Sequence, residues 1–239
     1  MNLRKVSQLD APKVSSYLEK IRNEDTSIDS FIHEIELLGC VYMIGGAIRD
    51  ICNDVEPRDL DIIIDCHQYE LRSVVTCHNH KINNFGGAKL YFNNIKIDVW
   101  TMESNWAFKE KIIQKHEDNI HRGAFYNFDS IVVNLTTHKL YSDIYNKAID
   151  DNCLDIIIDD KDIESNPSPA TNILRAYYIE CKYGLKPSIK LRSYIYNWLI
   201  SRENPAIELK KSEKRHFEDH FESSLDEYYD FIKKYLSYT

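Results

Sequence analysis

The chain has 239 residues, of which 43% are hydrophobic and 28% charged, a composition that excludes a disordered protein and allows one large or two small domains. Its 30 Lys and Arg against 38 Asp and Glu give a net charge of −8, which excludes a protein that coats nucleic acid over its whole surface. The longest apolar runs are far shorter than the roughly 20 residues of a membrane span, and the N-terminus shows no signal-peptide core, so we expect a cytoplasmic protein with no membrane contact. The six cysteines are dispersed, so we expect free thiols.

The first part of the chain predicts helices, strands and one glycine turn. Helical spacing of apolar residues predicts helices at 10–22 and 28–38, and a compact apolar run predicts a strand at 40–44. After the turn at Gly45-Gly46 we expect a helix at 47–52 and then, from a second apolar run, a strand at 60–64. Asp61 lies inside the last of these strands. A carboxylate in a buried strand is costly unless it binds a cation, so this acid is the first sign of a site.

The remaining elements give the fold class. We expect a helix at 67–77, two or three strands in 81–100 joined at Gly86-Gly87 and Asn93-Asn94, a β pair in 130–142, and helices from Pro169 onward, near 169–185, 189–201 and 211–237. The prediction is an α+β protein: a mixed β-sheet flanked by helices over 1–150, with the N-terminal helices in 1–39, then an acidic joint at 150–165 and a small all-helical domain over 166–239.

Three acids and a glycine turn form the candidate site. Strand spacing places Asp59 and Asp61 on one side of their strand, and alternation in 95–99 places Asp98 on the polar face of a later strand. Carboxylates suit Mg²⁺, and three of them can hold two ions for phosphoryl transfer. Gly45-Gly46 before a helix can present N–H groups to phosphate. Taken alone, the acid pair is explained by chance, and the glycine pair is explained by an ordinary tight turn. Taken together, the glycine turn and the three acids are hard to explain by packing.

These motifs resemble a known family. GGAIRD followed by PRDLDIII is similar to the head domain of class II tRNA nucleotidyltransferases and poly(A) polymerases, within the DNA polymerase β-like superfamily, and NPSPATNILRAYYIECKYGL is similar to the first helix of its neck. The resemblance implies a nucleotidyltransferase head followed by a neck-like helical domain. It implies a two-ion Mg²⁺ site, with Mn²⁺ as a substitute, and the following residues: Asp59, Asp61 and Asp98 as catalytic metal ligands, and Gly45, Gly46, Arg49, Asp50 and Arg175 as the nucleotide-binding set.

The sequence also departs from the family. The paired arginines before the segment that resembles DFTIN are missing, and no ExDxxR motif follows Leu185. Only about fifty residues follow the neck segment, fewer than the body and tail domains of full-length relatives need. We therefore expect a minimal stand-alone member rather than a CCA-adding enzyme.

The resemblance implies transfer of NMP from an NTP to an acceptor hydroxyl with release of pyrophosphate, and the acceptor we favour is an RNA 3′ end, tRNA included. One alternative is transfer to a small molecule or a protein, which the acidic balance favours. Another is a catalytically silent head that acts as a binding or regulatory module, for example in a toxin–antitoxin pair, with a protein partner that the sequence does not identify.

Two further features have alternative interpretations. Cys66-His67 and Cys77-His78-Asn79-His80 contain zinc-type ligands, although their spacing is not that of a finger and favours a helix with its C-terminal end. Segment 171–215 contains ten Lys and Arg against four Glu, with several tyrosines among them. It is either a phosphate-tracking surface with a stacking platform or a solvated helix face over core tyrosines.

Overall fold

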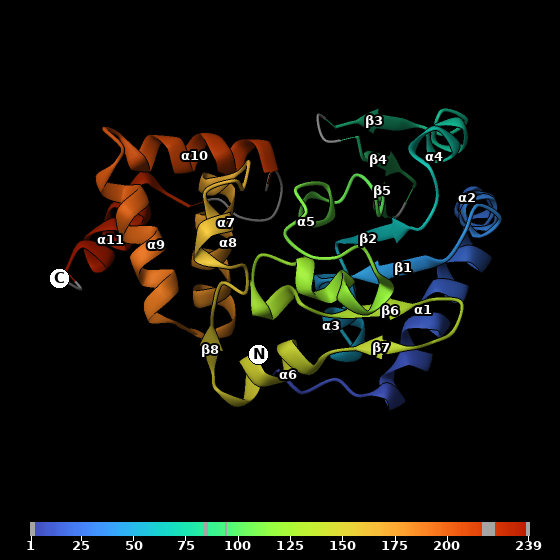
Figure 1. Cartoon of the computed structure of the whole chain (residues 1–239), viewed down its shortest axis with the longest axis horizontal. Helices are drawn as coiled ribbons and strands as arrows, with labels where there is room; N and C mark the ends of the chain where they lie inside the picture. Colours follow the sequence, from blue (N-terminus) through green and yellow to red (C-terminus); the bar gives the residue numbers. More distant parts are fainter. Residues whose placement is uncertain (1–2, 84–85, 94, 217–222, 238–239) are drawn as a thin grey trace. The chain divides into compact units, whose positions relative to one another are not determined.

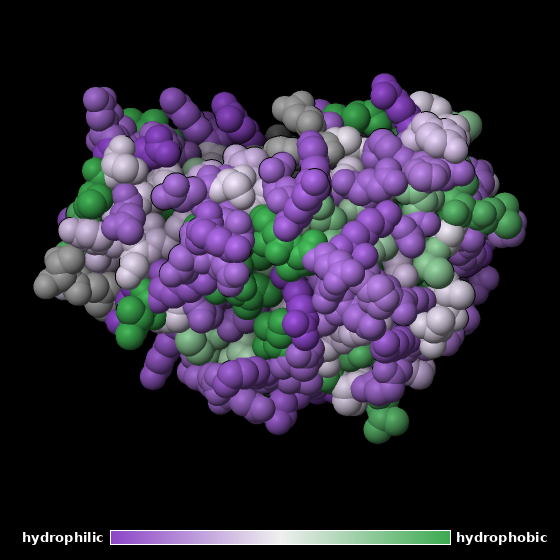
Figure 2. All heavy atoms as spheres, viewed as in Figure 1, coloured by the Kyte–Doolittle hydropathy of each residue, from purple (hydrophilic) through white to green (hydrophobic). Residues whose placement is uncertain are grey.

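The computed structural model describes residues 3–83, 86–93, 95–216 and 223–237 (Figure 1). Its internal contacts define two compact units, one formed by Arg4–Lys147 and the other mainly by the residues from Ala148 onward. We call them the head unit and the helical unit. Within the described ranges, no helix is long and apolar enough to cross a membrane. Hydrophilic residues predominate on the face shown in Figure 2.

The head unit is built on one seven-stranded sheet, with strand order β3-β4-β5-β2-β1-β6-β7. β2 pairs with β5 in parallel, and every other neighbouring pair is antiparallel. The two strands that contain the candidate acids are therefore adjacent at the centre of the sheet. The strands are β1 Val41–Ile44, β2 Asp59–Ile64, β3 His80–Ile82, β4 Ala88–Tyr91, β5 Lys96–Thr101, β6 Val132–Asn134 and β7 Leu140–Tyr141.

One face of this sheet is apolar and fully buried. Leu60, Ile62 and Ile64 of β2 and their β5 neighbours Ile97 and Val99 are all 0% exposed. Helices of the head unit pack against the strands and each other: α3 contacts β1 and β2, α4 contacts β5, and α1 contacts both α2 and α3. These helices are α1 Ala11–Glu24, α2 Thr26–Glu36, α3 Gly46–Cys52 and α4 Gln68–Val75.

The opposite face has an apolar end and a polar end. At the apolar end, Ile63 packs in a buried cluster with Phe108 of α5 (Trp106–Lys109) and Ile120 of the 3-10 helix η2 (Glu117–Gly123). At the polar end lie Asp59, Asp61 and Asp98, which are not members of that cluster. The sheet thus keeps one end of this face for polar side chains.

Within the described residues, the helical unit contains four longer helices, α8 to α11, drawn in yellow to red in Figure 1. α8 contacts α10, α10 contacts α11, and α11 contacts α9. Two short strands, β8 and β9, pair in parallel and join residues 153–154 to 186–187. The elements are β8 Cys153–Leu154, α7 Asp160–Ile163, α8 Pro169–Tyr183, β9 Lys186–Pro187, α9 Ile189–Ile200, α10 Pro205–His216 and α11 Leu225–Leu236.

The predicted α+β class is confirmed, and the helices and strands predicted up to residue 201 occur close to their expected positions. The sequence did not predict the β8–β9 pair in the otherwise helical part, α7 within the acidic joint, or α6 (Asp143–Asp150). The short helix α5 and the 3-10 helices η1 (Gln8–Asp10), η2 and η3 (Asn127–Asp129) were also not predicted. The expected helix at 211–237 is represented by the end of α10 and by α11, while 217–222 lies outside the described residues.

Candidate active site

The three predicted acids lie on one face of the central strands. Along β2 the burial alternates, so Asp59 and Asp61 project to the side opposite Leu60 and Ile62. In the parallel register Asp61 is the direct neighbour of Asp98 on β5. Adjacent residues in register project to the same side of a sheet, so Asp59, Asp61 and Asp98 share the polar end of the face.

Two of these acids already have cationic partners from the chain. Lys89 on β4 lies directly opposite Asp98, and its Nζ is 2.9 Å from the Asp98 carboxylate. The Arg58 guanidinium lies 2.6 Å from the Asp59 carboxylate. Burial raises the pKa of Asp98 and outweighs the opposing effect of Lys89. The acidic end of the face is therefore partly neutralised by Arg58 and Lys89.

The acid face fits a divalent cation in the kind and placement of its donors. Carboxylate oxygens are the ligands that Mg²⁺ prefers, and the cations of Arg58 and Lys89 already lie against two of the three carboxylates. In the described part of the chain, no three acidic, His or Cys side chains converge in the geometry of a metal site. The structure therefore gathers the donors on one face, and metal binding would require Asp59 and Asp98 to exchange their cationic partners.

The glycine turn brings α3 next to Asp61. Gly45, at the N-terminal boundary of α3, has φ +71° and ψ −140°, a conformation that side chains disfavour. A Cβ on Gly45 would lie 3.9 Å from Oδ2 of Asp61. The Gly45 N–H donates to the carbonyl of Ile131 over 2.8 Å, so it is engaged within the head unit. The phosphate contact of Gly45 and Gly46 stays a prediction.

Arg49 and Asp50 form part of the interior support of α3. The Arg49 side chain is 4% exposed, pairs with Asp50 at 3.0 Å and with Asp129 at 3.6 Å, and lies over the ring of Phe128 at 4.6 Å. These contacts join α3 to η3. We therefore regard Arg49 as a positioning residue for the turn, and its direct contact with a nucleotide stays a prediction.

Arg175 belongs to the helical unit, where it lies half-buried on α8. Its predicted contact with the nucleotide phosphates stays a prediction. The neighbouring Tyr177 packs against Phe231 of α11, with ring centroids 4.9 Å apart. Burial raises the pKa of Tyr194 to about 12. For these two tyrosines, the contacts and burial favour core packing over base stacking.

The Cys and His residues at 66–80 have separate local environments. Burial raises the pKa of Cys66 to about 11. His67 caps α4, the His78 ring nitrogen lies 3.2 Å from a Glu34 carboxylate oxygen, and His80 contacts the carbonyl of His78. These contacts match the helix-end interpretation of this segment.

The sequence interpretation did not identify Arg58 and Lys89. Strands in 81–100 were predicted, but the pairing of Lys89 with Asp98 follows from the register of Ala88–Tyr91 with Lys96–Thr101, which the sequence did not give. Arg58 directly precedes Asp59, and its position gave no signal beyond adjacency.

Residues 41–166, more than half of the chain, match the family described as the poly A polymerase head domain. No curated protein matches the chain in sequence. Among solved structures, a CCA-adding enzyme with CTP is similar with a TM-score of 0.60 and 16% identity, over 98% of this chain and 55% of that one.

Two further structures show the same fold. A tRNA-processing enzyme in its apo form I gives a TM-score of 0.57 and 18% identity, over 98% of this chain and 58% of that one. The Thermotoga maritima CCA-adding enzyme with tRNA gives a TM-score of 0.59 and 16% identity, over 92% of this chain and 53% of that one. The chain thus spans little more than half the length of these structures. It belongs to the poly(A) polymerase head-domain family, and its sheet has the nucleotidyltransferase fold that the GGAIRD and PRDLDIII motifs predicted.

Proposed function

We propose that the protein is a metal-dependent nucleotidyltransferase that transfers NMP from an NTP to an acceptor hydroxyl. The observation that carries this proposal is the shared face of Asp59, Asp61 and Asp98 beside the Gly45 turn. In this proposal the nucleotidyltransferase head is residues 1–150 and the neck-like helical domain is residues 166–239.

Asp59, Asp61 and Asp98 would hold Mg²⁺. When bound, the ion supplies positive charge to the phosphates and lowers the pKa of the acceptor hydroxyl. Arg58 and Lys89 lie against two of these carboxylates and offset part of their negative charge. The glycine turn, supported by Arg49, places the start of α3 next to Asp61, where the triphosphate would bind.

The proposed reaction balances without a further reactant. The acceptor oxygen forms a bond to the α-phosphorus as its proton leaves, and the bond from that phosphorus to the bridging oxygen breaks. Pyrophosphate departs with the electron pair. Asp98 would help to hold the ion near the acceptor hydroxyl and so favour loss of this proton to solvent.

The acceptor we propose is an RNA 3′ end, tRNA included. Structures with the fold of this chain include CCA-adding enzymes with CTP and with ATP, and one with tRNA. These complexes support a ribonucleotide substrate and an RNA acceptor. The net charge of −8 favours an acceptor held at one end over an RNA that is wrapped by the whole surface.

The test is a transfer assay with Mg²⁺ and each of the four NTPs, read as the mass gained by total RNA or by small-molecule acceptors. We expect RNA to gain nucleotide, and Asp59→Asn/Asp61→Asn to abolish the gain. Asp65→Asn is the matched control, because Asp65 follows the same strand but pairs with Lys115 on the surface. Mass gained only by small molecules would replace the acceptor, and no gain with any NTP would refute the activity.

A second candidate is a catalytically silent head that acts as a binding module. The ion pairs at Asp59 and Asp98 favour it, because they compensate these acids without a metal ion. A silent head would show the same melting temperature with and without Mg²⁺ and NTP, whereas an active head would be stabilised by them.

A further inference from the structure

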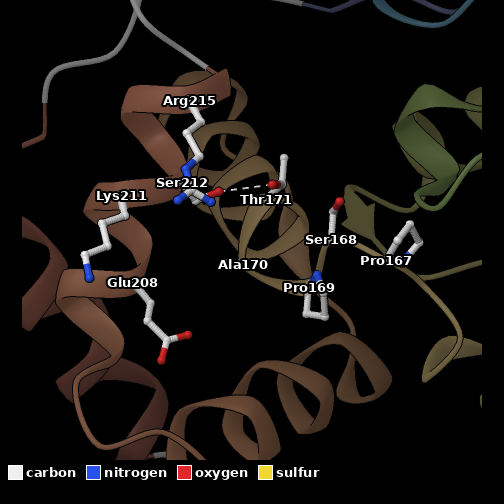
Figure 3. Close-up of a pocket in the computed structure, with 9 residues that line it drawn as sticks. All are labelled: Pro167, Ser168, Pro169, Ala170, Thr171, Glu208, Lys211, Ser212 and Arg215. Carbon is white, nitrogen blue, oxygen red and sulfur yellow. Dashed lines mark hydrogen bonds between the residues drawn. The ribbon is translucent and has the colours of Figure 1, made fainter. Parts of the chain in front are cut away.

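A cavity of about 280 Å³ lies in the helical unit between the first turn of α8 and one side of α10 (Figure 3). The predicted nucleotidyltransferase chemistry does not use it. Its polar wall comes from both helices: Ser168 and Thr171 from the start of α8, and Lys211, Ser212 and Arg215 from α10.

The charged side chains of this cavity leave a positive balance. Lys211 and Arg215 are exposed, and within the described ranges neither has an acidic partner. Glu208 is the acid of the cavity wall, and its carboxylate lies 3.9 Å from Nε of Arg202, outside the wall. Glu208 thus shares its charge with Arg202, while Lys211 and Arg215 remain available to an anion.

The backbone of α8 adds donors at the same place. Ser168, the N-cap of this 15-residue helix, makes no side-chain capping hydrogen bond, and Pro169 has no N–H. The Asn172 N–H donates to the Ser168 carbonyl over 3.1 Å. For the N–H groups of Ala170 and Thr171, no acceptor occurs among the residues that the structure describes. Both residues, at the positive end of the helix, line the cavity.

A hydroxyl pair joins the two helices at the cavity wall. Ser212 is only 8% exposed, and its Oγ lies 3.0 Å from Oγ1 of Thr171, as the dashed line in Figure 3 shows. Either hydroxyl can be the donor of this bond, so one proton of the pair, on Ser212 or on the half-buried Thr171, is not used in it. Both residues line the cavity.

We propose that this cavity, the α8–α10 pocket, binds a phosphate group. Its wall holds two cationic side chains, Lys211 and Arg215, against one carboxylate, Glu208, together with the hydroxyls of Thr171 and Ser212, a set in which hydrogen-bond donors predominate and which suits an oxyanion. The phosphate belongs either to an RNA backbone or to a free phosphate or nucleotide. The possibility that the phosphate belongs to RNA rests on the proposed function, whereas the proposal that the pocket binds phosphate does not.

The first test titrates the ¹⁵N-labelled protein with inorganic phosphate at constant ionic strength. We expect saturable shifts of the Ala170 and Thr171 amide signals, lost in Lys211→Gln/Arg215→Gln and kept in Lys214→Gln. Lys214 is the matched control, because it is exposed on α10 but does not line the pocket. Linear or absent shifts in the wild type, or equal loss in Lys214→Gln, would overturn the proposal.

The second test measures binding of a labelled 12-nucleotide single-stranded RNA by anisotropy over a range of salt concentrations. If the phosphate belongs to RNA, Lys211→Gln/Arg215→Gln lowers affinity about tenfold, since hydrogen bonds to charged groups are worth about 1.5–3 kcal/mol. It also reduces the salt slope by about 0.7, the value for one phosphate contact on a single strand. Thr171→Val, which removes one hydroxyl without changing charge, weakens binding without changing the slope.

The two tests together identify the source of the phosphate. RNA affinity that is lost in parallel with phosphate binding assigns the pocket to the RNA backbone. Unchanged RNA affinity with lost phosphate binding assigns it to a free phosphate or nucleotide. Neither test requires turnover, so a chain that transfers no nucleotide can still confirm the pocket, and an active enzyme can still refute it.

Discussion

Asp61 connects the two structural components of the candidate site. It faces Asp98 across the parallel strands, and Gly45 approaches it from the turn before α3. The separation of 3.9 Å between Oδ2 of Asp61 and a Cβ built on Gly45 leaves room for a methyl group. The glycine at 45 is therefore required by its backbone conformation and not by lack of space.

We expect Gly45→Ala to destabilise the head unit by about 1–3 kcal/mol, the usual range for a residue forced into a sparsely populated backbone region. Urea unfolding measures this loss. Gly184→Ala is the comparison, because Gly184 has φ +73° and ψ 14°, in the left-handed helical region, where alanine costs about 1–2 kcal/mol. Wild-type stability of Gly45→Ala would show that the turn relaxes at no cost.

His121 gives the head unit a pH dependence of known sign. It is 4% exposed, and burial lowers its pKa, although the carboxylate of Asp143, 3.2 Å from Nε2, partly opposes this. The folded state thus favours neutral His121, and this contribution to stability is present above the unfolded pKa of about 6.5 and is lost as pH falls through the folded pKa.

We therefore expect the melting temperature to fall more steeply between pH 7 and pH 5 in the wild type than in His121→Gln. Melting curves in buffers of equal ionic strength measure the difference. His116→Gln is the control, because the His116 side chain is 58% exposed and lies in the same segment. Parallel profiles for the wild type and His121→Gln would mean that His121 is charged at no cost in the fold.

At the scale of elements, the central strands were predictable because their pattern is local. The apolar run in Asp59–Ile64 and the alternation in Lys96–Thr101 indicate which residues are buried, and the structure confirms it. β8 and β9 were not predictable. They have two residues each and pair across more than thirty positions, so neither contains a repeating pattern.

The candidate site was predictable in its residues but not in its charge balance. The DxD spacing and the alternation around Asp98 place three acids on one face from sequence alone. The cationic partner Lys89 depends on the register of β4 with β5, which arises from a hairpin fixed by packing. The sequence therefore overstated the electrostatic cost of these acids in the absence of a metal.

α5 and η2 stabilise the sheet face that contains the acids. Phe108, at 8% exposure, packs in the cluster with Ile63 and Ile120. We expect Phe108→Ala to destabilise the head unit by about 3–5 kcal/mol, the usual cost of removing a buried phenyl ring. Leu37→Ala, at a side chain that is 73% exposed, should change stability by less than about 0.5 kcal/mol. Similar small losses in both variants, measured by urea unfolding, would contradict a stabilising role for this cover.

For the whole molecule, the proposed function predicts stabilisation by its substrate. Mg²⁺ and NTP at one hundred times the dissociation constant should add about 2.7 kcal/mol. For a protein of this size, that corresponds to a rise in melting temperature of roughly 5–10 °C. Asp59→Asn/Asp61→Asn should lose the shift and Asp65→Asn should keep it, so equal shifts in all three proteins would place the nucleotide elsewhere.

The two ends of the head unit are held together. Val6 exchanges hydrogen bonds with the side chain of Asn146, at 2.8 and 2.7 Å, and its carbonyl also accepts from Oγ of Ser142 over 2.8 Å. The polypeptide enters and leaves this unit at nearly one point. Such a unit is suited to transplantation into a surface loop of another protein, because its flanking residues need no spacer to reach their new neighbours.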